Sequence, residues 1–180
     1  FCATVYFYVD ALILSKAAKL FGKLDDAKKY EQLANDIRQA LNDKYFDKEK
    51  CIYARGSQTE LSMALYWGIV PDEYRQEVAK HLAEDVVSKD YHLDVGVHGC
   101  KALLCALSEN GYADVAYRVA VQDTYPSWGA WIAQLGATTL RENWTFDNND
   151  SDNHIMYGEI GAWPYKGLGG IYPDERQPGF

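Results

Sequence analysis

The sequence predicts an all-α fold in which helix pairs form a toroid of inner and outer helices. Apolar residues recur at helical spacing in three stretches, and each stretch is followed across a short turn by a more highly charged helical stretch. A helix that is apolar all round is buried, whereas an amphipathic helix lies on the surface. Because the two kinds alternate along the chain, they predict two concentric rings of helices.

The first predicted pair consists of helices at residues 5–21 and at about 25–44. Gly22 follows the first helix, at the position where a glycine commonly ends one. Asp25 or Asp26 begins the second helix, whose exposed face carries charged side chains. A short turn separates the two helices, so they are predicted to form a helical hairpin.

Two further pairs are predicted, at residues 58–67 with 71–88 and at 99–108 with 112–122. Ser57 or Thr59 is expected to cap the helix at 58–67, because Ser and Thr side chains accept hydrogen bonds from the first turn. Pro71 is expected to open the helix that follows, since its fixed φ suits the first helical position.

The connections between these helices are predicted to contain the functional residues. Residues 46–55 are expected to form a small hairpin or loop, and 91–96 a short extended segment. From residue 123 the pattern is rich in loops, with a short helical piece before a last helix at 162–168. In a toroid the connections that enter the inner helices emerge at one rim, where loops commonly build sites. These connections carry Tyr53, Arg55, His92, Asp94, His98, Trp128, Glu142 and His154.

Charge and composition limit the classes of partner. The net charge is −8, from 18 basic and 26 acidic side chains, and no basic run stands out, so nucleic acid is not expected. No apolar stretch reaches the roughly 18 residues of a membrane span, so no membrane partner is expected. The four cysteines have no metal-ligand spacing and are expected to be free and mostly buried.

The chain begins at Phe1 and enters a helix almost at once. We therefore expect it to be a piece of a longer polypeptide, whose N-terminal part is its partner in the toroid. Half a toroid would expose apolar flanks on its first and last inner helices, so the chain alone is expected to self-associate.

Glu142 is the leading catalytic candidate. It lies in the stretch GATTLRENW at residues 136–144, where small residues allow close approach and Trp144 offers a stacking face for a sugar. The surroundings of a carboxylate can set its protonation, so Glu142 can serve as a general base that activates water. The alternative interpretation is a surface glutamate paired with Arg141.

Three further residues are candidates for binding the substrate. His154 follows Asn153 in the stretch NHIMYG, and both are substrate-binding candidates. His154 can donate to a sugar hydroxyl, although a core histidine bonded to the backbone is the commoner case. Trp128, in YPSWG, lies in a Pro/Gly turn that is expected to present its side chain, as a sugar platform or as a packing wedge.

No metal and no cofactor are expected. The stretch DNNDSDN at 147–153 is similar to a calcium loop, but the EF-hand template requires Gly and Glu where Asp152 and Gly158 stand. Asp94 and His98, near a cysteine, match no standard zinc spacing. The sequence has no P-loop, no dinucleotide glycine motif and no nucleophile elbow.

Taken together, GATTLRENW, YPSWG and NHIMYG resemble the C-terminal half of the catalytic domain of glycoside hydrolase family 78, the α-L-rhamnosidases. The likeness extends over essentially all 180 residues and includes HLDVGVHG and ENGYADVAYR. It implies that residues 1–180 are the C-terminal portion of an (α/α)6 barrel. It also implies hydrolysis of terminal α-L-rhamnosides with inversion, so the expected substrate is a rhamnose-containing glycan or glycoside.

The resemblance implies roles for individual residues. Glu142 matches the family's general base, His154 a sugar contact, and Trp128 part of the pocket wall. Arg141 and Asn143 depart from the family pattern, in which an aromatic residue often precedes the glutamate and Arg or Asp often follows it. The family's general acid lies upstream, so this chain is expected to supply one of the two carboxyl groups that an inverting glycosidase needs.

Two other classes of function stay open. A lyase or an epimerase can use the same toroid: a lyase acting on uronates favours a cationic cleft, and this chain is acidic. An epimerase typically uses two histidines, for which His92, His98 and His154 are available. Outside the enzymes, the alternative is a helical glycan-binding module without turnover.

Overall fold

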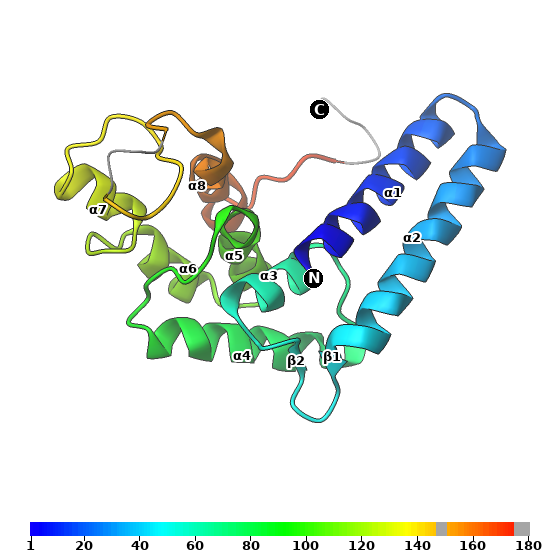
Figure 1. Cartoon of the computed structure of the whole chain (residues 1–180), viewed down its shortest axis with the longest axis horizontal. Coiled ribbons are helices and arrows are strands. Elements are labelled where there is room, and N and C mark those ends of the chain that lie inside the picture. Colours follow the sequence, from blue (N-terminus) through cyan, green and yellow to red (C-terminus); the bar gives the residue numbers. More distant parts are fainter. Residues whose placement is uncertain (147–150, 175–180) are drawn as a thin grey trace.

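A computed structural model describes residues 1–146 and 151–174 of the chain and confirms the predicted all-α fold (Figure 1). Three helical hairpins, α1–α2, α3–α4 and α5–α6, follow one another, and the shorter helices α7 and α8 come after them. The long helices are α1 (Cys2–Leu20), α2 (Leu24–Tyr45), α3 (Gln58–Tyr66), α4 (Arg75–Ser88), α5 (Val97–Glu109) and α6 (Ala113–Ala120). The shorter elements are β1 (Phe46–Asp47), β2 (Ile52–Tyr53), η1 (Asp72–Tyr74), α7 (Trp128–Ala133), η2 (Ile155–Tyr157), α8 (Glu159–Trp163) and η3 (Pro164–Leu168).

The predicted connections are also present. β1 and β2 pair antiparallel, with Phe46 opposite Tyr53, as expected for the hairpin at 46–55. Ser57 is the cap of α3: its side chain accepts from the backbone N–H of Glu60, whose carboxylate accepts in return from the N–H of Ser57. The last predicted helix begins three residues earlier than expected, at Glu159, and continues through Pro164 as the π-helical turn η3.

The packing of α3 against α5 forms the centre of the fold. Most side chains of these two helices are buried, as predicted for inner helices, and α4 and α6 cover them. Gly99 allows the two helices to approach at their N-terminal ends. A Cβ at Gly99 would lie 2.9 Å from the Thr59 Cα and 2.5 Å from its Oγ1, so any side chain there would force the helices apart.

Contacts between loops bring the N-terminal ends of the inner helices together. The Phe1 and Tyr53 rings lie 5.9 Å apart, which joins the start of α1 to the connection that enters α3. The Gln58 side chain at the start of α3 accepts from the backbone N–H of Asp94 at 2.9 Å, which joins α3 to the connection that enters α5. The predicted convergence of these loops at one rim is therefore present.

All four cysteines are free, as predicted. Cys100 and Cys105 are buried in α5, and Cys2 and Cys51 are half-buried. Burial raises the pKa of the Cys105 thiol to about 11, with a further contribution from the nearby Glu159 carboxylate. Within the described ranges, no helix combines the length and the apolar character that crossing a bilayer requires.

Helix α1 has an uncovered apolar face, although its sequence is that of an inner helix. It packs mainly on α2, and the two form a long hairpin that extends away from the other helices (Figure 1). Val5, Tyr8 and Val9 are buried, whereas Phe7 and Leu14 on the outer side are 53% and 47% exposed. Contiguous exposed apolar surface of this kind favours association.

We expect the 180-residue chain to self-associate through this face of α1. Phe7→Gln combined with Leu14→Gln should shift the chain toward monomer, because it takes apolar surface away without touching the buried side of α1. Sedimentation velocity at several concentrations measures the shift. Val87→Gln, at a 46% exposed position on α4, is the matched control and should leave association unchanged. A wild-type chain that is monomeric at all concentrations contradicts this expectation.

Candidate active site in the segments before α8

Two segments that precede α8 lie side by side and carry most of the candidate residues. The backbone N–H of Glu142 donates to the carbonyl of Ser151 at 3.0 Å, and the N–H of His154 donates to the carbonyl of Leu140 at 2.8 Å. The Thr139 hydroxyl adds a bond to the Asp152 carbonyl. These bonds bring Glu142 and His154 together from the two ends of a long connection.

The Glu142 side chain is exposed and is held at one of its oxygens. Its Oε2 accepts from the backbone N–H of Ser151 at 3.0 Å, and its Oε1 has no hydrogen-bond partner within residues 1–146 and 151–174. Arg141 forms an ion pair with Asp152, with 2.9 Å between its Nε and the Asp152 Oδ1. Glu142 therefore has an exposed side chain whose carboxylate is oriented at one oxygen.

An aromatic cluster lies against these segments and consists of Trp128, Trp131, Trp144 and Tyr157. Trp131 stacks on Trp144 at 4.6 Å between ring centroids, and Tyr157 meets Trp144 edge-on at 4.7 Å. The indole N–H of Trp144 donates to the carbonyl of Val95, which ties the cluster to the loop before α5. Trp144 is half-buried, and the other three members are buried.

The expectation that the Pro/Gly turn presents Trp128 is wrong. Trp128 is the first residue of α7, and Ser127 caps that helix by accepting from the backbone N–H of Ala130. The indole N–H of Trp128 donates to the carbonyl of Tyr157 at 3.1 Å, so both the ring and its polar atom are used in packing. Trp128 is therefore a packing wedge in this chain. Its contact with a sugar stays a prediction.

Tyr157 is a member of the site that the sequence analysis did not single out. Burial raises its pKa to about 12, with smaller contributions from Cys100 and from the charge of Glu142. The phenol is therefore protonated at neutral pH, within electrostatic reach of Glu142. The sequence feature that could have identified Tyr157 is its position in NHIMYG, three residues after His154.

His154 and Asn153 differ in their environment. The Nδ1 of His154 is buried, and no described residue hydrogen-bonds to it. A buried polar atom without a partner is uncommon in folded proteins and indicates a place where a ligand or water supplies the bond. The Asn153 side chain is exposed, and its backbone N–H donates to the Ser151 hydroxyl.

The side chains of His92 and Asp94, in the loop before α5, already have partners within the described chain. His92 is bonded through Nδ1 to the carbonyl of Lys89 and through Nε2 to the Thr124 hydroxyl, and Asp94 pairs with Lys89 at 2.8 Å. His98 packs on the ring of Tyr6 at 5.0 Å between centroids. Across residues 1–146 and 151–174, no group of three His, Cys, Asp or Glu side chains is placed to hold a metal. Residues 147–150 of the calcium-like stretch at 147–153 lie outside the described residues.

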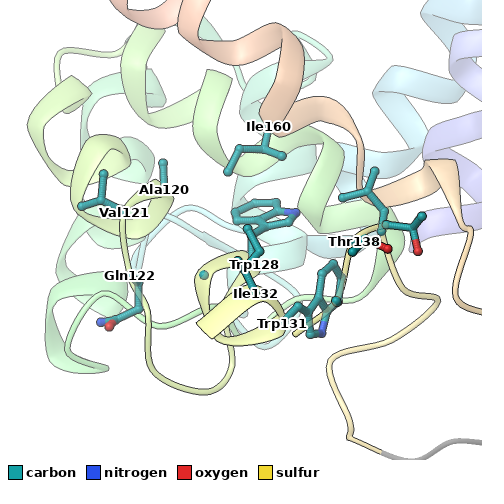
Figure 2. A pocket seen from close by; sticks show the side chains of 12 residues that line it. Ala120, Val121, Gln122, Trp128, Trp131, Ile132, Thr138 and Ile160 are labelled. Carbon is teal, nitrogen blue, oxygen red and sulfur yellow. The ribbon is translucent and has the colours of Figure 1, made fainter. Parts of the chain in front are cut away.

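Two largely apolar cavities lie beside these elements, and a polar cavity of about 270 Å³ lies at Arg141 and Asp152. An apolar cavity of about 460 Å³ separates the end of α6 from the 137–140 segment. Figure 2 shows Val121 and Gln122 on one side of it, Thr138 on the other, and Trp128 between them. Glu142 does not line this cavity. A second cavity, of about 480 Å³, lies between α1, α5 and α8 and is lined by Tyr6, Val97, Lys101, Ile155, Met156, Gly158 and Glu159.

Glu159, which lines the second cavity, is the largely buried centre of an ion network. Glu159 accepts from Lys101 at 3.0 Å and from Lys166 at 2.9 Å, and its side chain is 10% exposed. Burial disfavours the ionised form, but the hydrogen bonds from the two lysines outweigh it, so the pKa of Glu159 is lowered. The network links α5, α8 and η3 through one carboxylate.

Glu159→Gln should lower the free energy of unfolding at pH 7 by about 2 kcal/mol, because it breaks charge-assisted hydrogen bonds while keeping the shape. The pKa of Glu159 is lower in the folded chain than the unfolded value of about 4.3. Its stabilisation is therefore present above that value and is lost as the pH falls through the folded value.

Urea unfolding of wild type and variant at pH 7 and at successively lower pH tests this dependence, and the difference should narrow below about pH 4. Glu77→Gln is the control, because Glu77 pairs with Lys80 at the same 2.9 Å but on the surface. Removing that exposed pair should leave the free energy of unfolding almost unchanged, because solvent screens it. A difference at Glu159 that does not vary with pH contradicts the assignment.

Three successive helical hairpins are the architecture expected of part of a six-hairpin glycosidase domain. A family model described as the bacterial alpha-L-rhamnosidase 6 hairpin glycosidase domain matches residues 1–168. The chain belongs to this family, which confirms the resemblance in the sequence.

The curated relatives that match this chain include alpha-L-rhamnosidases. An alpha-L-rhamnosidase of Streptomyces avermitilis is 35% identical over 180 residues, covering 95% of this chain and 17% of the relative. An alpha-L-rhamnosidase of an Alteromonas species is 31% identical, covering 99% of this chain and 20% of the relative. The chain thus spans about a fifth of the length of the relatives it matches.

Solved structures agree with this assignment. The alpha-L-rhamnosidase from Dictyoglumus thermophilum matches with a TM-score of 0.82 and 42% identity, covering 90% of this chain and 19% of that one. The Streptomyces avermitilis alpha-L-rhamnosidase complexed with L-rhamnose matches with a TM-score of 0.87 and 34% identity, covering 99% and 18%.

Proposed function

We propose that this chain supplies the general base and part of the sugar pocket of an inverting α-L-rhamnosidase, with Glu142 as the base. The observation that carries the proposal is the state of the Glu142 carboxylate in a chain of this family. One oxygen is oriented by the Ser151 N–H, and the other has no hydrogen-bond partner among the described residues. A general base needs this combination of a fixed direction and a free lone pair.

In the proposed reaction, Oε1 of Glu142 takes a proton from a water molecule, and the resulting hydroxide attacks the anomeric carbon. The bond from that carbon to the leaving oxygen breaks, and a second carboxylic acid protonates this oxygen. The two carboxyl groups of an inverting glycosidase stand about 6.5–9.5 Å apart to leave room for the water. The second carboxyl group is proposed to come from another part of the whole enzyme.

The remaining candidates are proposed to hold the sugar. The Nδ1 of His154 lacks a partner among the described residues and is available to a sugar hydroxyl. Trp144 is the most accessible ring of the aromatic cluster and offers a stacking face, while Trp128 and Trp131 hold that ring in place. Asn153, exposed beside His154, is proposed as a further polar contact. The L-rhamnose complex of the Streptomyces avermitilis relative supports a rhamnosyl substrate.

The test is hydrolysis of an aryl α-L-rhamnoside by the full-length enzyme that contains this chain. Glu142→Gln should lower kcat by about 10²–10⁴-fold with a small change in KM, because it removes proton transfer and keeps the shape. NMR should show β-L-rhamnose as the first product of the wild-type enzyme. Glu31→Gln, an exposed glutamate on α2, is the control and should leave kcat unchanged.

Each other outcome identifies a different function. α-L-rhamnose as the first product indicates a retaining mechanism, and near-normal kcat in Glu142→Gln removes Glu142 as the base. An unsaturated product indicates a lyase, and an isomerised sugar indicates an epimerase. Binding of a glycan without turnover indicates a binding module.

A further inference from the structure

We propose that the ion pair between Arg141 and Asp152 is a clamp that positions Glu142 and His154 for the reaction, so that Asp152 is a positioning residue. This inference rests on the proposed function of Glu142. The clamp is defined as this ion pair together with the backbone bonds between residues 139–142 and 151–154.

The clamp lies between the two candidate residues. Arg141 is next to Glu142 in one segment, and Asp152 is separated from His154 by a single residue in the other. The backbone bonds from Glu142 to Ser151 and from His154 to Leu140 lie on either side of the ion pair. A displacement of Asp152 would therefore change the relative position of both residues.

The two halves of the clamp have very different environments. Arg141 is 5% exposed, whereas the Asp152 side chain is 75% exposed. An exposed ion pair contributes little because two long side chains must both be ordered. Packing already orders Arg141, so only the short Asp152 side chain has to be fixed. The buried guanidinium therefore acts as an anchor for the segment that carries Asp152.

The carboxylate of Glu142 depends directly on the anchored segment. Its Oε2 accepts from the backbone N–H of Ser151, the residue before Asp152. The backbone of His154 is held by Leu140, the residue before Arg141. A misplacement of about 1 Å in a catalytic group can cost about 10²-fold in rate. The clamp is therefore proposed to act through Glu142 and His154.

The first test uses Asp152→Ala in the full-length enzyme. This exposed position tolerates substitution, so the melting temperature should change little while kcat falls by about 10–100-fold. Asp152→Glu keeps the charge and should recover part of the rate. Glu77→Gln removes the exposed Lys80 pair of the same 2.9 Å length on α4 and should leave kcat unchanged.

A double-mutant cycle separates positioning from a general effect on the enzyme. The part of the loss that Asp152→Ala causes through Glu142 should be absent in the Glu142→Gln background, so the further fall in kcat there should be clearly smaller than in the wild-type background. A full additional loss of 10–100-fold would mean that Asp152 acts elsewhere and would overturn the proposal. An inactive Glu142→Gln beside a normal Asp152→Ala would overturn the clamp and keep the proposed function.

A measurement without substrate covers the case in which Glu142 is not the base. The backbone N–H groups of Glu142, Ser151 and His154 all donate hydrogen bonds between the two paired segments. Their hydrogen exchange in Asp152→Ala should be at least tenfold faster than in wild type, with exchange in α3 and α5 unchanged. Unchanged exchange at these three amides would overturn the clamp whatever the activity.

Discussion

The packing of α3 against α5 is the contact on which the other elements depend. Most side chains of both helices are buried, and each helix is covered on its outer side by the second helix of its own hairpin. Gly99 lets them meet closely at the ends where the connecting loops enter. Because this end is closely packed, the loops before α3 and α5 are held next to each other. The hydrogen bond from the Trp144 indole to the Val95 carbonyl attaches the segment of Glu142 to the loop before α5.

The site is built from irregular backbone that takes its order from two sources. Direct hydrogen bonds between residues 139–142 and 151–154 set the position of the two segments relative to each other. The aromatic cluster sets their position relative to the helices, since Trp131 of α7 stacks on Trp144 and Tyr157 packs against both. Aromatic side chains suit this task because they bury large areas and keep few rotatable bonds.

Charged groups in this structure are placed according to their solvation. Glu159 is largely buried, and it is ionised because two lysines compensate for the lost water. Arg141 is buried beside an acid that stays in solvent. Glu142, in contrast, is exposed and accepts one backbone hydrogen bond from the described part of the chain. The two ionic groups that organise the structure are therefore shielded, and the carboxylate proposed for chemistry is accessible.

The sequence alone determined the helix pairs, the order of apolar and charged helices, the Ser57 cap and the family. These follow from periodicity, capping residues and local motifs, which act over a few residues. Glu142 and His154 could be proposed as site residues for the same reason, since each lies in a short recognisable stretch. Tertiary structure decided the burial of Trp128, the place of Tyr157 and the pairing of Arg141 with Asp152. Each of these is a contact between residues distant in the sequence, and its partner is set by how the helices pack.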